Sequence, residues 1–213
     1  MMNSRKEALL RHWTKEQVIT DQHVLNAFKK VPREKFVLPK YKDEAYHDYP
    51  LPIPAEQTIS QPTTVLIMTE NLRVEKGQKI LEVGTGSGYQ AALLSVLVGN
   101  KGKIITTEVV PELFEFALKN LKSYKNVQIM KVTQESLGYK KEAPYDRIIV
   151  TAALPEIPQT LYEQLKEGGI IVAPVGSEYS QELFAVEKIR KSLVNMKRLG
   201  MFQFVPVRGR YGF

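Results

Sequence analysis

The 213-residue chain has no cysteine, only three histidines, and no apolar run near the roughly 20 residues that span a bilayer. Without cysteine there are no disulfides and no thiolate metal site. His12, His23 and His47 show no ligand spacing, so we expect no bound metal. The first residues lack a signal-peptide pattern. These absences favour a cytoplasmic protein with no membrane partner.

Acidic residues are missing from the end of the chain. Residues 188–213 carry seven Lys or Arg and no Asp or Glu, and residues 1–42 carry ten against four. Residues 43–187 hold thirteen basic and nineteen acidic residues. Basic ends can attract polyanions, but no basic run is interleaved with aromatics as in a single-strand binding platform. We therefore expect a solvated basic surface rather than a nucleic-acid partner.

Strand-like and helix-like segments alternate from residue 79 onward. Apolar runs predict strands at 79–83, 103–108, 127–132, 145–151 and 170–174. Helices are predicted at 90–98, 111–121 and 158–166, the last ending at Gly168-Gly169. Two further strand-like runs, 182–189 and 201–207, are expected to form an antiparallel edge. The pattern predicts a doubly wound, mostly parallel α/β sheet of seven strands.

Residues 1–78 are expected to form a helical and substrate-loop region of the same single domain, 1–213. The first forty residues indicate short helices, one of them capped by Asp21. Residues 39–62 include five prolines, which predicts an ordered loop placed to act as a lid. Ser60 is expected as the N-cap of a helix that reaches residue 72, with Pro62 in its first turn.

Three glycines at alternate positions, Gly84, Gly86 and Gly88, separate the predicted strand 79–83 from the predicted helix 90–98. Glycine allows a sharp turn whose backbone N–H groups approach a ligand closely. The dinucleotide pattern G-x-G-x-x-G would need a small residue at Tyr89, and no Gly-Lys-Ser/Thr of a phosphate loop follows. The spacing therefore indicates S-adenosylmethionine, bound by the glycines with Thr85 and Ser87 between them.

Two acidic residues flank this turn. Glu108 ends a predicted strand and stands where an acid accepts hydrogen bonds from ribose hydroxyls; the alternative is a solvated carboxylate at a strand end. Glu82 directly precedes the glycines and is expected near the ammonium of the methionyl group, met directly or through water. A buried Glu without a partner is unfavourable, so this position favours a ligand contact.

Three motifs together resemble the protein-L-isoaspartate O-methyltransferases: Thr58-Ile-Ser-Gln-Pro62, the glycine run 81–90, and residues 143–158. Residues 31–37, 174–176 and 204–206 fit the same family. The glycine run is common to many methyltransferases, whereas the first motif is far more specific. The resemblance implies a class I methyltransferase fold. It also implies methyl transfer from S-adenosylmethionine to the α-carboxylate of isoaspartyl residues in damaged proteins or peptides, which initiates repair and leaves S-adenosylhomocysteine.

The resemblance assigns the substrate site to the first motif. Ser60 would hydrogen-bond the isoaspartyl carboxylate and orient it, with Thr58, Ile59 and Gln61 as neighbours. A carboxylate with a pKa of about 4 is already ionised at neutral pH, so no strong base is needed. The alternative for Ser60 is a plain helix cap whose side chain is used on a backbone N–H.

One stretch departs from the family pattern. Relatives usually carry Gly-Asp-Gly after the third core strand, where the Asp meets the adenine amino group; this chain has Thr133-Gln134-Glu135. Gln134 can accept a hydrogen bond through its amide oxygen, and Glu135 can substitute after a one-residue shift. We expect weaker cofactor affinity as a result.

Two alternative functions stay open. A nucleic-acid methyltransferase on the same fold would use the basic ends, but Thr151-Ala-Ala-Leu154 stands where an Asn/Asp-Pro-Pro-aromatic signature is expected, and no cysteine is available for pyrimidine C5 methylation. A non-catalytic S-adenosylmethionine-binding module is suggested only by the departure at 134–135. Whichever function holds, we expect the protein to be a monomer.

Overall fold

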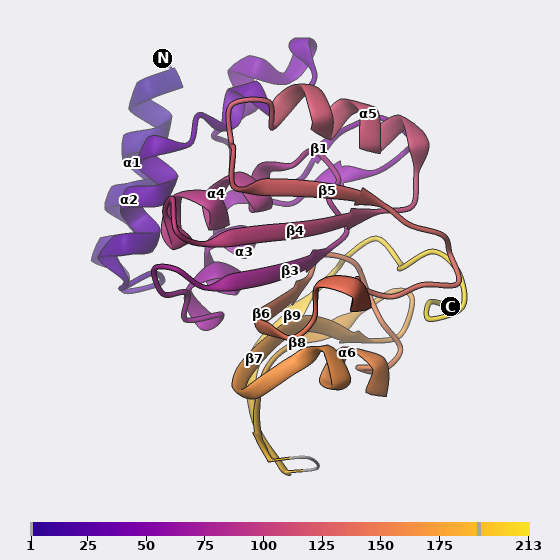
Figure 1. Cartoon of the computed structure of the whole chain (residues 1–213). Coiled ribbons are helices and arrows are strands. Elements are labelled where there is room, and N and C mark those ends of the chain that lie inside the picture. The colour runs from indigo at the N-terminus through magenta and orange to yellow at the C-terminus, as the bar shows by residue number, and fades with distance from the viewer. Residues whose placement is uncertain (1, 191–192) are drawn as a thin grey trace.

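The computed structural model describes residues 2–190 and 193–213, and its centre is one seven-stranded sheet (Figure 1). In spatial order the strands are β5 (Val127–Lys131), β4 (Lys103–Glu108), β3 (Lys79–Val83), β6 (Tyr145–Val150), β7 (Leu165–Gly176), β8 (Gln181–Arg190) and β9 (Leu193–Phe202). The first five are parallel to one another, β8 is antiparallel to β7, and β9 is antiparallel to β8. The predicted mostly parallel sheet with an antiparallel edge is confirmed.

Alternate strand residues point to opposite faces, and each face has its own apolar layer. Ile80 and Ile104 pack with α1 (Met2–Lys15), α2 (Gln22–Lys30), α3 (Pro62–Asn71), α4 (Tyr89–Val98) and α5 (Pro111–Asn120). Leu81 and Ile105 pack on the other face with Leu161 of α6 (Gln159–Gln164). Burial on both faces explains why these strands are continuously apolar. The N-terminal helices share one cluster with the sheet, while the single-domain assignment stays a prediction.

The region before β3 is more regular than a loop. The helices α1 and α2 are followed by 3-10 turns at Arg33–Lys35 and Pro39–Glu44 and by a small hairpin of β1 (Leu51–Pro52) and β2 (Thr58–Ile59). The cap at Asp21 is confirmed, because its side chain accepts the His23 N–H. Prolines therefore shorten the elements of 39–62 without removing them.

Two predicted boundaries near the end of the chain are wrong. Gly168-Gly169 does not end a helix but lies inside β7, where φ of +74° at Gly168 accommodates a register shift against β6. The strand expected at 201–207 ends at Phe202. The chain beyond it, which we call the tail (residues 203–208), crosses to the segment that follows β6, because the Ala153 N–H donates to the Val205 carbonyl and the Val207 N–H to the Ala153 carbonyl.

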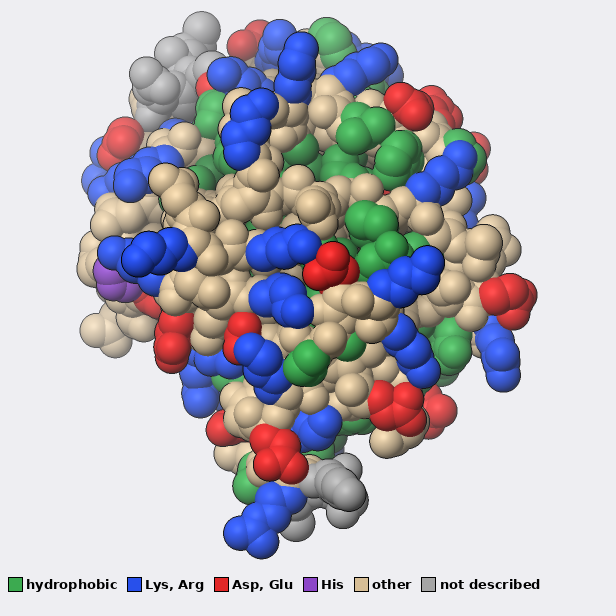
Figure 2. All heavy atoms as spheres, viewed as in Figure 1, with side chains coloured by type: hydrophobic (Ala, Val, Ile, Leu, Met, Phe, Trp, Pro, Cys, Tyr) green, Lys and Arg blue, Asp and Glu red, His purple; other side chains and the backbone are tan. Residues whose placement is uncertain are grey.

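The surface carries mixed charge. On the face shown in Figure 2, Lys and Arg side chains are spread over the molecule and interspersed with Asp and Glu. In the described part of the chain, no helix combines the length and apolar character needed to cross a membrane. A 3-10 turn, Lys140–Glu142, completes the regular elements described.

Candidate active site

The three glycines form the turn from β3 into α4. Gly84, Gly86 and Gly88 have φ of +96°, +54° and +85°, a region that favours glycine. The Gly84 N–H donates to the Thr107 carbonyl of β4 at 3.0 Å, which holds the turn at the strand end. A Cβ on Gly84 would lie 2.6 Å from Thr151 Oγ1, so close packing requires glycine here as well. The positive φ angles and the close contacts with Thr107 and Thr151 together fix the conformation of this turn.

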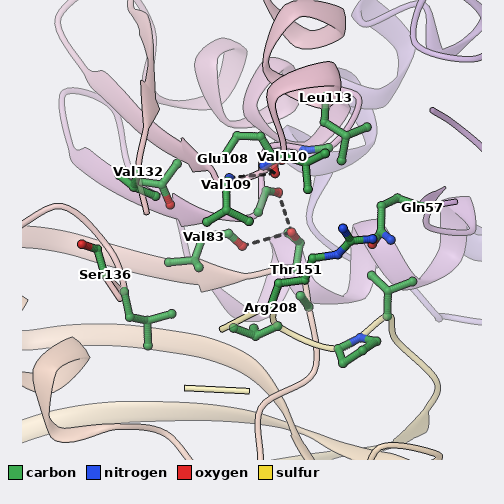
Figure 3. Close-up of a pocket in the computed structure, with 18 of the residues that line it drawn as sticks. Gln57, Val83, Glu108, Val109, Val110, Leu113, Val132, Ser136, Thr151 and Arg208 are labelled. Atoms are coloured by element: carbon green, nitrogen blue, oxygen red, sulfur yellow. Dashed lines mark hydrogen bonds between the residues drawn. The ribbon is translucent and has the colours of Figure 1, made fainter. Parts of the chain in front are cut away.

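Glu108 lies against the glycine turn at the end of β4. Its Oε2 accepts the Gly86 N–H at 2.9 Å, and its Oε1 accepts the N–H groups of Val109 and Val110, each at 2.9 Å (Figure 3). Three donors leave an ionised carboxylate able to accept at least one more hydrogen bond. The turn and the carboxylate therefore orient each other before any ligand arrives.

Glu82 lies one residue before the end of β3 and is fully buried. Neither carboxylate oxygen has a hydrogen-bond partner within the described residues. Burial raises the pKa of the Glu82 carboxyl to about 8. An unpartnered buried carboxylate is unfavourable unless a donor or a cation completes it, so this group marks a place for a cationic ligand.

Three adjoining cavities surround these groups. The inner cleft, about 710 Å³ with its open mouth, is lined by residues 57–58, 83–84, 86, 107–110, 113, 132, 136–137, 151–152 and 205–208. The glycine chamber, about 420 Å³, is lined by residues 58–60, 65, 68, 82, 84–87, 89–90 and 151. The outer groove, about 1630 Å³, is lined by residues 50, 58, 60–61, 64, 151, 178–179 and 201–206. The three cavities adjoin one another, because they share lining residues at positions 58 and 151.

Thr58 and Thr151 line all three cavities, and Ser60 lines the glycine chamber and the outer groove. Thr151 donates its hydroxyl proton to the carbonyl of Gly84 at 2.6 Å. Figure 3 shows Thr151 among the residues that line the inner cleft. The half-buried Ser60 hydroxyl has no hydrogen-bond partner within the described residues. A free hydroxyl therefore stands where the chamber opens into the groove.

Ser60 is not a helix cap. The N-cap position of α3 is Gln61, and Pro62 is the first helical residue. The one hydrogen bond that Ser60 forms within the described residues is accepted by its carbonyl, from Arg33 Nη2 at 2.7 Å. The prediction of an N-cap is therefore wrong by one residue, and the hydroxyl is left available for a ligand.

The structure brings most predicted site residues together. Those that line a cavity are Thr58, Ile59, Ser60, Gln61, Glu82, Gly84, Thr85, Gly86, Ser87 and Glu108. Gly88 caps α4 behind them. Gln134 and Glu135 are exposed and line none of the three cavities, and the neighbouring Ser136 and Leu137 line the inner cleft instead. Their predicted adenine contact remains a prediction.

Sequence reasoning missed two parts of the site. Thr151 follows β6, and the rule that ligands bind at the carboxyl ends of parallel strands was a sufficient signal for it. The tail, including Arg208 in Figure 3, lines the inner cleft and the outer groove. Residues 204–206 match the family pattern, but that match does not show that the tail lines the site, because its position depends on pairing with Ala153.

Comparison with known proteins gives one consistent family. The family model described as "Protein-L-isoaspartate(D-aspartate) O-methyltransferase (PCMT)" matches residues 3–212. Protein-L-isoaspartate O-methyltransferase 2 of Archaeoglobus fulgidus is 49% identical over 210 residues, covering 98% of this chain and 95% of that protein. The Methanosarcina mazei protein-L-isoaspartate O-methyltransferase is 51% identical over 201 residues, covering 93% and 82%.

Solved structures agree with the sequence relatives. A protein-L-isoaspartate O-methyltransferase superposes with a TM-score of 0.86 at 30% identity, covering 97% of this chain and 67% of that one. A putative protein-L-isoaspartate O-methyltransferase of Plasmodium falciparum, solved with S-adenosyl-L-homocysteine, gives a TM-score of 0.81 at 27% identity, covering 96% and 99%.

Proposed function

This chain belongs to the protein-L-isoaspartate(D-aspartate) O-methyltransferase family, and we propose that it methylates the α-carboxylate of L-isoaspartyl residues in damaged proteins and peptides, using S-adenosylmethionine. The observation that carries the proposal is the free Ser60 hydroxyl at the opening between the glycine chamber and the outer groove. This hydroxyl supports the proposal, because it can donate a hydrogen bond to a substrate carboxylate beside the turn that we expect to bind the cofactor.

The residues present fit S-adenosylmethionine. Glu82 offers an unpartnered carboxylate to the cofactor's ammonium, and Glu108 retains acceptor capacity for ribose hydroxyls. Apolar side chains of Val109, Val110 and Leu113 line the inner cleft, where an adenine ring needs flat apolar walls. When bound, the cofactor supplies an electrophilic methyl group on a sulfonium.

The chain's own task is positioning. A carboxylate is ionised at neutral pH and needs no general base, so Ser60 orients its attacking oxygen toward the methyl carbon. A neutral hydroxyl suits this role, since a tight ion pair with Lys or Arg would make the carboxylate less nucleophilic. Ser60 has three neighbours that we expect to contact the substrate as well, Thr58, Ile59 and Gln61. The C–S bond breaks as the C–O bond forms, and the products are the methyl ester and S-adenosylhomocysteine.

The outer groove suits a polypeptide better than a polyanion. Among the described residues that line it, the one charged side chain is the acidic Glu178, and the others are apolar or neutral. A nucleic acid would meet no cation there. We further propose that the protein acts as a cytoplasmic monomer on isoaspartyl proteins. Size-exclusion chromatography with light scattering tests the monomer, and fractionation of cells tests the location.

One experiment separates this function from its rivals. Transfer of a radiolabelled methyl group is measured to an isoaspartyl peptide, to the same peptide with a normal aspartyl residue, and to RNA. We expect label on the isoaspartyl peptide only. Label on RNA alone supports a nucleic-acid methyltransferase, while calorimetric binding of S-adenosylhomocysteine without transfer to any acceptor supports a binding module. Either result overturns the proposal.

A further inference from the structure

Arg33 carries a fully buried guanidinium. It lies in the 3-10 turn Arg33–Lys35, and its side chain is 0% exposed. Nε donates to the carbonyl of Ala45 at 2.8 Å, and Nη2 donates to the carbonyl of Ser60 at 2.7 Å. Nη1 has no partner, and within the described residues the guanidinium forms no ion pair. Two neutral carbonyls thus accept its hydrogen bonds, while the charge of Asp48 favours the cation without forming an ion pair with it.

A charge in this position is not explained by packing. Burial lowers the pKa of Arg33 to about 10, so the side chain is still a cation at neutral pH. Removing a charge from water without a counter-ion is unfavourable, and an apolar side chain of similar volume would fill the space without that penalty. What an apolar side chain cannot supply is a rigid plane of directed donors.

The guanidinium links three parts of the site. Besides the Ala45 and Ser60 carbonyls, it lies over the ring of Tyr89, with Cζ 5.0 Å from the ring centroid. Tyr89 is the first residue of α4 and lines the glycine chamber together with Ser60. Arg33 therefore spans from the peptide of Ser60 to the helix that starts at the glycine turn.

Ser60 depends on this link. It follows the two-residue strand β2 and precedes the N-cap of α3, and no side chain caps that helix. The bond from Arg33 is the one hydrogen bond that Ser60 makes within the described part of the chain. Fixing its carbonyl fixes the peptide plane between Ser60 and Gln61, which positions the Ser60 Cα and restricts the direction of the Cα–Cβ bond that carries the hydroxyl.

We propose that Arg33 is a positioning residue for the methyl-transfer reaction, which holds the Ser60 hydroxyl at its distance from the glycine turn through the Ser60 carbonyl. The proposal rests on the function proposed above, in which Ser60 orients the substrate carboxylate. Misplacement of a reacting group by about 1 Å can slow a reaction about 100-fold, so loss of the link acts on turnover. Glu82 and Glu108, which face the cofactor, are left in place.

Arg147 provides a control that is matched in burial and in its bonds to backbone carbonyls, although unlike Arg33 it also forms an ion pair, with Glu75 at 4.0 Å. It is also buried, at 9% exposure, and also donates to backbone carbonyls, from Nε to Leu72 and from Nη1 to Asp146, each at 2.8 Å. It lies near the amino end of β6, at the sheet edge opposite the three cavities, and lines none of them. A purely structural buried arginine should behave like Arg147.

The test compares Arg33→Met and Arg33→Lys with Arg147→Met and Arg147→Lys. Each variant is characterised by kcat and KM on an isoaspartyl peptide, by calorimetric affinity for S-adenosylhomocysteine and by Tm. We expect Arg33→Met to lower kcat about 10- to 100-fold with unchanged affinity for S-adenosylhomocysteine, and Arg33→Lys to recover part of the loss. The Arg147 variants should lower Tm and leave kcat unchanged well below that Tm.

Two results overturn the proposal. One is unchanged kcat in the Arg33 variants, and the other is a parallel loss of kcat and S-adenosylhomocysteine affinity, which indicates general damage to the fold. If Arg33→Met does not fold, Arg33→Lys decides by the same two criteria. A wild-type protein that does not methylate the peptide refutes the proposed function instead, so the two failures are distinguishable.

Discussion

The two halves of the candidate site are built differently. The cofactor half, formed by the glycine turn and the end of β4, is held by short-range hydrogen bonds at the ends of two neighbouring parallel strands, such as the Gly84 N–H to the Thr107 carbonyl and the Gly86 N–H to the Glu108 carboxylate. The substrate half, formed by residues 57–61 and the tail, is held by the short hairpin of β1 and β2 and by a few contacts from segments distant in sequence, such as Arg33 to Ser60 and Ala153 to the tail. The cofactor half is therefore preorganised by the sheet, whereas the substrate half depends on a few links between loops.

The two buried glutamates of the cofactor half differ in how many hydrogen-bond partners the protein gives them. Glu108 is satisfied by three backbone N–H groups, and Glu82 has no partner within the described residues. Glu108 therefore stabilises the fold and the cofactor site together. Glu82 destabilises the cofactor-free fold, which is typical of a group whose hydrogen-bond partner is supplied by a ligand.

The strongest test of the comparison between the halves is Ser60→Ala. We expect kcat on an isoaspartyl peptide to fall about 100- to 1000-fold, because a donor that orients the reacting group is lost. Affinity for S-adenosylhomocysteine should not change, since the hydrogen bonds that hold the cofactor half do not involve the Ser60 hydroxyl. Steady-state kinetics and calorimetry give both values. Ser123→Ala, at an exposed serine between α5 and β5, is the control. Equal losses in turnover and binding would contradict the division.

Glu82→Gln is expected to weaken S-adenosylhomocysteine binding about 10- to 100-fold, because a charge-assisted hydrogen bond to the ammonium becomes a neutral one. Titration calorimetry measures the affinity. Glu115→Gln, on the exposed face of α5, should leave binding unchanged. Unaltered affinity in Glu82→Gln would show that the cofactor's ammonium does not contact Glu82.

Glu108→Gln should have the opposite effect from Glu82→Gln on stability. An amide NH₂ would face backbone N–H groups that now donate to a carboxylate oxygen, so we expect a loss of about 1–3 kcal/mol in the free energy of unfolding. Chemical denaturation of the cofactor-free protein measures it, with Glu82→Gln run in parallel. If both variants shift stability in the same direction, the contrast between the two glutamates is wrong.

The pH dependence of stability provides a further test. Folding raises the pKa of Glu82 from 4.5 to about 8, so the folded protein binds the extra proton between these values. Its contribution to stability is present below the lower value and is lost as pH rises to the upper one. The Tm of the cofactor-free wild type should therefore fall over this range relative to Glu82→Gln. Parallel Tm curves for the two proteins would refute the assignment.

The smallest effect is expected for Gln134→Asp. The sequence departure predicts that Asp would tighten cofactor binding, but Gln134 is exposed and outside the inner cleft. We expect the affinity for S-adenosylhomocysteine to change less than about threefold, as for a surface substitution. Calorimetry distinguishes this from clear tightening, which would show that position 134 reaches the adenine and would extend the cofactor half beyond the sheet edge.

The cofactor half was predictable because its signals are local. A buried strand, alternate glycines and a following helix occupy consecutive residues, and Glu108 ends the next strand, so the topology brings them together at one edge. The substrate half was predictable only in part. Ser60 was found through its motif, yet its place before the N-cap, its link to Arg33 and the return of the tail past Ala153 join residues far apart in the chain.

By itself, the sequence determined the parallel sheet, the glycine turn and the cofactor, and it predicted the residues expected to contact that cofactor. The reason is that strand and turn propensities act over neighbouring residues and the alternation of strands and helices permits few topologies. The tertiary structure decided which hydroxyl is free, which carboxylate is unpartnered and which buried cation holds Ser60. Those properties depend on what surrounds each group in space, and no stretch of consecutive residues contains that information.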